Sequence, residues 1–293
     1  MHRLVYLRRM EVRGASFYLR ESGERCVNTT GNIRHPQHDL LCAQVRSWYR
    51  SSAPELGYLV EHRGFGFYGR QRGNPHAARI IVDRPCPNEI EVLQADARKF
   101  FGDVEIDIWI DEPETDVTLG PALLRAGYYF RGATVYLAHV GEPPGIKPLP
   151  NVSLKPVSAA LLKEFALVKL KGFGNTEDQP SAGRVAQEVE SRAAELRGSG
   201  RCLLARVGNE AVAIIGYYEG NDRLVFNLAT RVPFRKMGVA RLLLSTVLRD
   251  AYRRRCRSVI INTDPADTPV NWYRRLGFTD EVYWHRSYLY RPI

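Results

Sequence analysis

Eleven residues, Thr230–Ala240 (TRVPFRKMGVA), combine residue types and a spacing that could hold an anion. Arg235, Gly238 and Ala240 give the pattern Arg-x-x-Gly-x-Ala between an apolar run and a leucine-rich stretch. Small residues at the second and third positions let a ligand approach the backbone closely. A helix that begins here would direct unpaired N–H groups and its positive dipole end at the turn, which favours a phosphate. An ordinary strand-to-helix turn would contain the same glycine, so both interpretations stay open at this point.

Other glycine motifs do not indicate a nucleotide site. The turn contains neither the Gly-Lys-Ser/Thr of a P-loop nor a Gly-x-Gly-x-x-Gly. The second pattern does occur at Gly64, Gly66 and Gly69, but RQRGNPH follows it instead of an amphipathic helix. We therefore expect an aromatic β-segment there.

A second informative string, Asn271–Phe278 (NWYRRLGF), begins 33 residues beyond Gly238. Tyr273 lies in it on an expected short helix. A tyrosine in such a place is more often a packing residue than a catalyst, so its meaning depends on the turn upstream.

The elements that must position these residues follow from periodicity and turn signals in the second half of the chain. The hairpin turn Gly208-Asn209 is the clearest signal. We expect strands at 152–157, 202–207, 211–218, 224–230 and 258–263, helices at 159–170, 184–196, 239–254 and 269–276, and a terminal strand pair within 278–290.

The first half reads less clearly and ends in a linker, 140–151, that is half proline and glycine. We expect helices at 40–49, 89–101 and 119–125, and strands at 78–82, 104–110 and 134–140. From residue 78 this order repeats that of the second half, and LLRAGYYF echoes YRRLGFTD. The linker and the repeat predict an α+β chain of two domains, residues 1–145 and 151–293.

Composition limits the class of protein. A chain of 293 residues with 44% apolar and 25% charged residues is typical of a globular protein with two domains. No apolar run approaches the ~20 residues that cross a bilayer, and arginines interrupt the N-terminus too often for a signal peptide. Five scattered cysteines form no Cys-x-x-Cys pair, and His35 and His38 lack further ligands nearby. We expect a cytoplasmic protein without a disulfide framework, a metal site or a membrane partner.

The net charge of +10 lies almost wholly in the second half. Residues 1–150 carry 19 Lys and Arg against 18 Asp and Glu, and residues 151–293 carry 23 against 14. An excess of this sign favours an anionic partner, although solubility alone would also explain it. The arginine run 249–257 could likewise contact a phosphate or form a solvated helix face, and we favour the solvated face.

Taken together, RKMGVA and YRRLGF in this order resemble the acyl-CoA-binding core of the GNAT acyltransferase superfamily. The resemblance covers 151–293, and residues 78–140 resemble a degenerate copy in which only DRPCPN stands where the turn should be. The chain is thus similar to a tandem GNAT protein with one donor site. The implied fold is a mixed, mostly antiparallel sheet with a V-shaped splay between two parallel strands.

The resemblance implies a role for each matching residue. The main chain of Leu228, Ala229 and Thr230 would pair with the pantetheine arm of acetyl-CoA or another acyl-CoA. Tyr273 would protonate the departing thiolate. The pyrophosphate would lie on the turn, whose residues are Arg235, Lys236, Met237, Gly238, Val239 and Ala240, with the Arg235 side chain adding charge.

The implied reaction is direct transfer of an acyl group to an amine in a ternary complex, and it needs a base. Many relatives place a carboxylate on the strand before the turn, but this chain has Phe226-Asn227-Leu228-Ala229 there. Asn227 could hold a water molecule, and Glu219, Asp264 and His285 are alternative bases. The first half would form part of the acceptor cleft or buttress the second half.

Three interpretations of the function remain at this point. The first is an N-acyltransferase acting on a small-molecule or peptide amine, as a monomer or homodimer. The second is a domain that senses acyl-CoA without turning it over, which the missing carboxylate would explain. The third is a nucleic-acid-directed protein. The basic residues argue against it, because they lack the interleaved aromatic residues of a single-strand binding platform.

Overall fold

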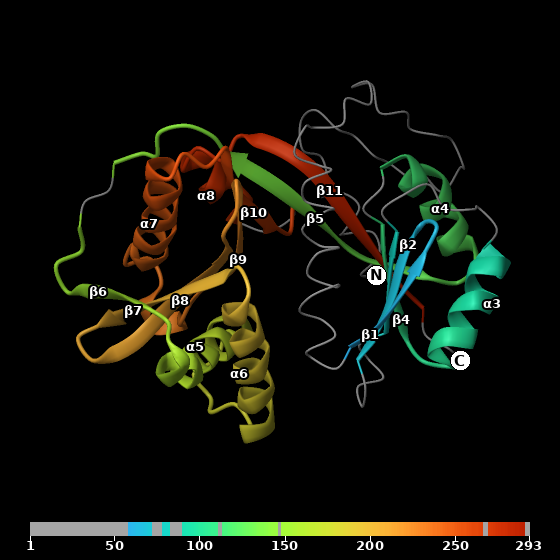
Figure 1. Cartoon of the computed structure of the whole chain (residues 1–293), viewed down its shortest axis with the longest axis horizontal. Coiled ribbons are helices and arrows are strands. Elements are labelled where there is room, and N and C mark those ends of the chain that lie inside the picture. Colours follow the sequence, from blue (N-terminus) through green and yellow to red (C-terminus); the bar gives the residue numbers. More distant parts are fainter. Residues whose placement is uncertain are drawn as a thin grey trace, which may run out of the picture.

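A computed structural model describes residues 58–71, 78–82, 90–110, 113–145, 148–265 and 269–290. Within these residues the strands form one mixed sheet of eleven, in the order β1-β2-β3-β4-β11-β5-β10-β9-β8-β7-β6 (Figure 1). The neighbouring pairs β3/β4 and β9/β10 are parallel, and the other described pairs are antiparallel. The expected mixed α+β fold is confirmed. The expected helix 40–49, His35, His38 and the DRPCPN segment lie outside the described residues.

The second half follows the predicted order of elements closely. The hairpin turns at Gly208, whose φ is 58°, as the sequence predicts. The elements are β6 (Val152–Pro156), a 3-10 helix η2 (Ala159–Leu161), α5 (Leu162–Gly174), α6 (Ala182–Arg197), β7 (Gly200–Val207), β8 (Glu210–Tyr218), β9 (Asp222–Thr230), a 3-10 helix η3 (Val232–Phe234), α7 (Val239–Arg253), β10 (Ser258–Thr263), α8 (Pro269–Arg275) and β11 (Asp280–Tyr290).

The first half repeats part of this order. It consists of β1 (Tyr58–Arg63), β2 (Gly66–Gln71), β3 (Ala78–Val82), α3 (Ile90–Phe101), β4 (Ile106–Ile110), α4 (Pro113–Arg125) and β5 (Tyr129–His139). The run β3-α3-β4-α4-β5 corresponds to β9-α7-β10-α8-β11, as the sequence echo predicts. The glycine-rich segment at Gly66 is strand β2, so the β-segment interpretation is confirmed. A Cβ atom at Gly66 would lie 1.9 Å from the carbonyl oxygen of Ile81, which explains why only glycine fits beside β3.

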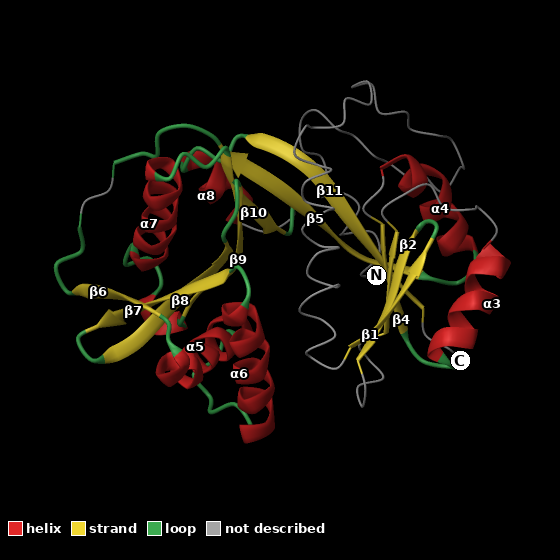
Figure 2. Ribbon diagram, in the orientation of Figure 1, coloured by secondary structure: helices red, strands yellow, loops and turns green. Residues whose placement is uncertain are grey.

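Helices cover both faces of the sheet in the second half (Figure 2). One face packs against α5 and α6 through a cluster that includes Phe165, Leu204 and Ile214. The other face packs against α7 and α8 through a larger cluster that includes Leu243 and Tyr273. In the first half α3 and α4 both pack into one cluster. We call the two faces of the second half the α5/α6 face and the α7 face.

Two long strands, β5 and β11, join the halves into one sheet (Figure 1). The β5 strand leaves the first half and pairs with β10 through Val135–His139. The β11 strand leaves the second half and pairs with β4 through Arg286–Tyr290. The two also pair with each other, so each half contains a strand that the other half's sequence supplies.

This exchange corrects the expected terminal strand pair within 278–290. That stretch is one strand of eleven residues, with register shifts between Glu281 and Tyr283 and between Ser287 and Tyr288. Its neighbours are β4 and β5, so it needs no hairpin partner of its own. In the described part of the chain, no helix has the length and apolar character that crossing a membrane requires.

Candidate functional site

The carboxyl-terminal part of β9 contains a bulge at Asn227. Gly216 of β8 pairs with Phe226 and Ile214 pairs with Ala229, so β9 uses one residue more than β8 over the same distance. Asn227 has a φ of 53°, a left-handed conformation that asparagine tolerates better than most residues. The extra residue reverses the alternation of side chains, since Leu228 packs on the α7 face and Ala229 on the α5/α6 face.

Beyond the bulge, β9 separates from its parallel neighbour β10. The described pairing runs from Asp222/Ser258 to Val225/Ile261 and then stops, although both strands continue. On its other side β10 stays paired with β5 as far as Thr263. The main chain of β9 after Val225 therefore has hydrogen-bonding groups on the β10 side that no described strand uses.

The turn after β9 leads into the amino terminus of α7. Lys236 and Gly238 both have positive φ, 64° and 83°, and Gly238 is the N-cap of the helix. No side chain caps this end, and among the described residues the amides of Lys236, Met237 and Gly238 donate to no other backbone group. These three residues are also exposed. The turn is thus an open set of N–H donors at the positive end of a helix of fifteen residues, and such a site suits an anion.

The Arg235 side chain braces this turn. Its Nε donates to the carbonyl of Thr230 at 3.1 Å and its Nη2 to the carbonyl of Gly172 at 2.7 Å. Gly172 lies so close to β9 that a Cβ atom there would be 3.0 Å from the Cβ of Ala229. The end of α5 therefore supports both the strand and the turn.

Arg231 makes a second brace just before η3. Its Nε donates to Glu177 at 2.9 Å and its Nη1 to Glu210 at 2.6 Å, which ties the end of β9 to the loop after α5 and to the β7–β8 hairpin. The hydrogen bond to Glu177 is the main cause that raises the pKa of Arg231. Neither the sequence position of Arg231 nor its neighbours signalled this role.

Tyr273 lies on α8 and is 7% exposed within the α7-face core. Its ring packs against Trp272 and Phe278, with centroids 5.0 and 6.0 Å away. The same core holds Val239 of the turn and Leu228 of the bulged strand. The fold thus brings the two sequence motifs to the same face of the sheet. Ala240 is half-buried in the first turn of α7.

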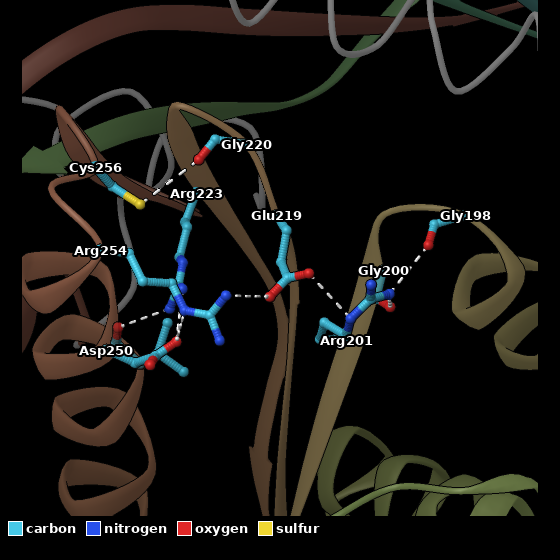
Figure 3. Close-up of polar contacts among 10 residues, drawn as sticks. Gly198, Gly200, Arg201, Glu219, Gly220, Arg223, Asp250, Arg254 and Cys256 are labelled. Carbon is cyan, nitrogen blue, oxygen red and sulfur yellow. Dashed lines mark hydrogen bonds and ion pairs between the residues drawn. The ribbon is translucent and has the colours of Figure 1, made fainter.

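The candidate bases occupy different ends of this region. Glu219 follows β8 and forms ion pairs with Arg201 at 3.0 Å and with Arg254 at 3.8 Å (Figure 3). Because Tyr218 pairs with Leu224, Glu219 lies at the amino-terminal end of β9, away from the bulge. Asp264 follows β10 at the same end of the sheet as the bulge, and it is exposed. The side chain of His285 lies outside the described ones.

A buried arginine beside Glu219 holds α7 onto the sheet (Figure 3). Arg223 is 1% exposed, donates to the carbonyl of Val247 at 3.2 Å and to Asp250 at 2.6 Å, and stacks over the Tyr217 ring. Removing one partner of such a pair would leave an uncompensated buried charge. In the same region Arg254 pairs with Asp250, and Arg257 pairs with Asp222. These two arginines of the 249–257 run thus have structural partners.

Comparison with known proteins identifies this arrangement. Residues 172–278 match the acetyltransferase (GNAT) family. This half of the chain contains a GNAT domain. A search of curated proteins by sequence found no match.

Solved structures extend the likeness of fold to the whole chain. A GCN5-related N-acetyltransferase from Kribbella flavida is similar over 87% of this chain and 95% of its own, with 16% identity and a TM-score of 0.63. A tandem GNAT protein from the clavulanic acid biosynthesis pathway is similar over 92% and 90%, with 12% identity and a TM-score of 0.58. A GCN5-related N-acetyltransferase from Sphaerobacter thermophilus is similar over 77% of each chain, with 17% identity and a TM-score of 0.57. At these identities the likeness shows the fold, and that fold is a tandem GNAT.

The GNAT domain therefore combines a bulged strand, a splay, a turn with open N–H donors and a buried tyrosine. Among the described residues, no group of three or more metal-ligating side chains is placed to hold a metal ion. Sequence reasoning missed the braces that Gly172, Arg231 and Arg223 provide. Only Gly172 carries a signal, since a glycine inside an amphipathic helix often marks a close backbone approach.

Proposed function

We propose that this protein is an N-acetyltransferase that transfers the acetyl group of acetyl-CoA to a primary amine by direct attack in a ternary complex. The observation that carries the proposal is the combination of the Asn227 bulge with the open turn at Gly238 on one strand–helix unit. The bulge leaves main-chain groups of β9 available beside the splay. The turn that follows the end of β9 offers N–H donors. A long donor with an amide-containing arm and a pyrophosphate would use both features.

The turn would bind the pyrophosphate. Among the described residues, the amides of Lys236–Gly238 donate to no other backbone group, so they can donate to phosphate oxygens without breaking a bond. The first N–H groups of α7 likewise have no partner within the helix. Val239 is buried and fixes the start of the helix beneath them. The exposed side chain of Arg235 would add positive charge from its braced position.

The main chain of Leu228–Thr230 would pair with the pantetheine arm and direct the thioester into the splay. An amine nitrogen then attacks the thioester carbonyl, and the new C–N bond forms while the oxygen becomes negative. A strand N–H in Leu228–Thr230 would stabilise this oxyanion. When the C–S bond breaks, Tyr273 would give its proton to the leaving thiolate. Asn227 would hold a water molecule near the reacting atoms.

The proposal includes the division of the chain into units of residues 1–145 and 151–293, with the donor bound by the second. The exchange of β5 and β11 makes each unit depend on the other for one strand. The acceptor would be a small molecule or a peptide amine.

The test measures thiol release from acetyl-CoA with phenethylamine, spermidine, glucosamine and a lysine-containing peptide as acceptors. Wild type should release thiol only with an amine present, and Tyr273→Phe should lower kcat by ~10- to 100-fold while acetyl-CoA still raises the melting temperature. Tyr252→Phe is the matched control, because Tyr252 is 49% exposed on α7. Equal rates for wild type and Tyr273→Phe would show that Tyr273 is not the acid.

A second candidate function is an acyl-CoA sensor, which the uncharged stretch Phe226–Ala229 favours because it places no carboxylate at the bulge. The same assay separates the two functions. A melting-temperature increase with acetyl-CoA but no thiol release with any of the four amines would support the sensor.

A further inference from the structure

The two faces of the sheet at the splay have different roles under the proposed function, on which this inference rests. The turn, α7 and Tyr273 all lie on the α7 face. The donor therefore occupies that side, and an acceptor must reach the thioester from the α5/α6 face. Residues on that second face near the splay are the ones that can meet the amine.

Alternation along β10 identifies which of its residues face that side. Val259 and Ile261 pack into the α7-face core, whereas Ile260 packs with Leu224 on the opposite side. Because the side chains of a strand alternate between its two faces, Asn262 and Asp264 lie on the same side as Ile260. Asp264 is exposed and comes directly after the last residue of β10.

The register places Asp264 near the reacting end of β9. Ile261 pairs with Val225, and the bulge adds one residue to β9, so Asp264, three residues further on, is level with Ala229 across the splay. Ala229 follows the bulge and belongs to the stretch that would pair with the donor. Glu219, by contrast, directly follows Tyr218, which pairs with Leu224, so it lies at the amino-terminal end of β9. It forms ion pairs there with Arg201 and Arg254.

The first half supplies the other border of this region. Thr263 pairs with Val135 of β5, which puts Thr134 opposite Asp264 in the same register. Tyr136 packs on the face of Ile260, so alternation places Thr134 on that face as well. On the β9 side, the Phe226 ring lies against Gly216 and Tyr218 on the α5/α6 face.

We propose that the acceptor binds as an ammonium ion on the α5/α6 face, between Phe226 of the GNAT domain and Thr134 of the first half, and that Asp264 is its general base. Asp264 attracts the ammonium and takes one proton from it, directly or through one water molecule. The neutral nitrogen then forms the C–N bond and gives its second proton to solvent, the C–S bond breaks, and the thiolate receives its proton from Tyr273. Solvent returns both residues to their starting states by taking the proton from Asp264 and supplying one to Tyr273.

The test compares two amines of different basicity with Asp264→Asn. The first is the fastest of the four amines above, which is an ammonium at neutral pH, and the second is methoxyamine, which is already neutral there and needs no prior deprotonation. Asp264→Asn should lower kcat/KM by ~100-fold or more for the first amine and by less than ~10-fold for methoxyamine. Asp264→Glu should restore part of the rate with the first amine. The melting-temperature increase with acetyl-CoA should stay as in wild type.

Control variants distinguish a wrong assignment of Asp264 from a wrong proposed function. Glu219→Gln, a carboxylate change at the far end of β9, should leave both rates unchanged. Thr134→Tyr should raise KM for the acceptor and leave the shift with acetyl-CoA unchanged. An equal loss for both amines, or no loss, would overturn the assignment of Asp264 while the proposed function stands. If wild type turns over none of the amines, the proposed function fails and this inference with it.

Discussion

The two parallel strand pairs of this molecule differ in the feature on which the proposed donor site depends. In the first half, β3 and β4 pair along their whole length, from Ala78/Ile106 to Val82/Ile110. In the second half, β9 and β10 pair only as far as Val225/Ile261, and the bulge at Asn227 follows. A closed pair uses its main-chain groups within the sheet, whereas an opened pair offers them to a ligand. Under the proposed function, the extra residue in β9 is therefore the feature that separates the two halves.

The helices that follow the two parallel pairs, α4 and α8, share a backbone geometry but differ in one side chain. Gly127 and Gly277 end α4 and α8 with φ of 88° and 90°. In both cases the next residue donates its N–H to the carbonyl five residues earlier, Tyr128 to Leu123 at 3.0 Å and Phe278 to Tyr273 at 3.1 Å. The backbone repeats, but a fully buried leucine stands where the second half has its tyrosine. The first half thus keeps the geometry of the unit without its hydroxyl group.

The largest expected effect tests whether the halves are independent. Tyr288 belongs to β11 but is 4% exposed in the core of the first half, and its hydroxyl donates to Asp116 at 3.0 Å. Tyr288→Ala should lower the free energy of unfolding by about 4 kcal/mol, because it leaves a cavity and removes a buried hydrogen bond. Urea unfolding measures this, with the exposed Tyr252→Ala as control. A change below about 1 kcal/mol would mean that β11 is dispensable for the first half.

The next effect concerns the donor turn. Gly238→Glu introduces backbone strain at φ of 83° and a negative charge among the amides that we propose bind the pyrophosphate. It should lower kcat/KM for acetyl-CoA by at least ~100-fold, which corresponds to about 2.7 kcal/mol. Gly127→Glu is a matched control, since Gly127 has φ of 88° and open space around it. Equal losses in the two variants would show that strain, and not the lost donor site, causes the effect.

A smaller effect should follow from pushing α5 away from β9. Gly172→Leu places a Cβ atom 3.0 Å from Ala229, so either the helix or the strand must move. We expect a loss of about 2 kcal/mol in the free energy of unfolding and weaker binding of acetyl-CoA in calorimetry. Gly183→Leu in α6, where a Cβ atom meets nothing within 4 Å, should do neither. Unchanged binding by Gly172→Leu would separate the α5 brace from the donor site.

The smallest effect is a pH dependence where the halves meet. His139 of β5 is 5% exposed beside Gly277 and Phe278, and burial lowers its pKa because it disfavours the charged ring. An unfolded histidine titrates near ~6.5, so the unfolded state binds the proton more readily below that pH. Stability contributed by the neutral ring is complete above ~6.5 and declines as the pH falls below it. Between about pH 7 and pH 5, the melting temperature of wild type should fall more than that of His139→Gln. Parallel curves for the two proteins would contradict this.

Local signals explain how much of the fold the sequence predicts. The Gly208-Asn209 hairpin and the run from 224 to 276 are encoded by turn residues and periodicity within short windows. The exchange of β5 and β11 joins residues about 150 positions apart, and no local pattern carries that information. For the same reason the burial of Arg223, which depends on Asp250 and Tyr217, does not follow from its position in a polar turn.

Part of the candidate site could likewise be predicted from the sequence, and part of it could not. The turn and Tyr273 are short motifs, and their common location on the α7 face is a consequence of the fold. The position of Asp264 across from the end of β9 could not be predicted, because it depends on the parallel register of β10 with β9. The register is a property of the assembled sheet and not of either strand.

Isothermal titration of the full chain with acetyl-CoA tests the central claim most directly, that the molecule has one donor site and that it lies at Gly238. Wild type and Gly127→Glu should each bind one molecule per chain, and Gly238→Glu should bind none in the same concentration range. Two molecules bound per wild-type chain, or one bound by Gly238→Glu with unchanged affinity, would contradict this account.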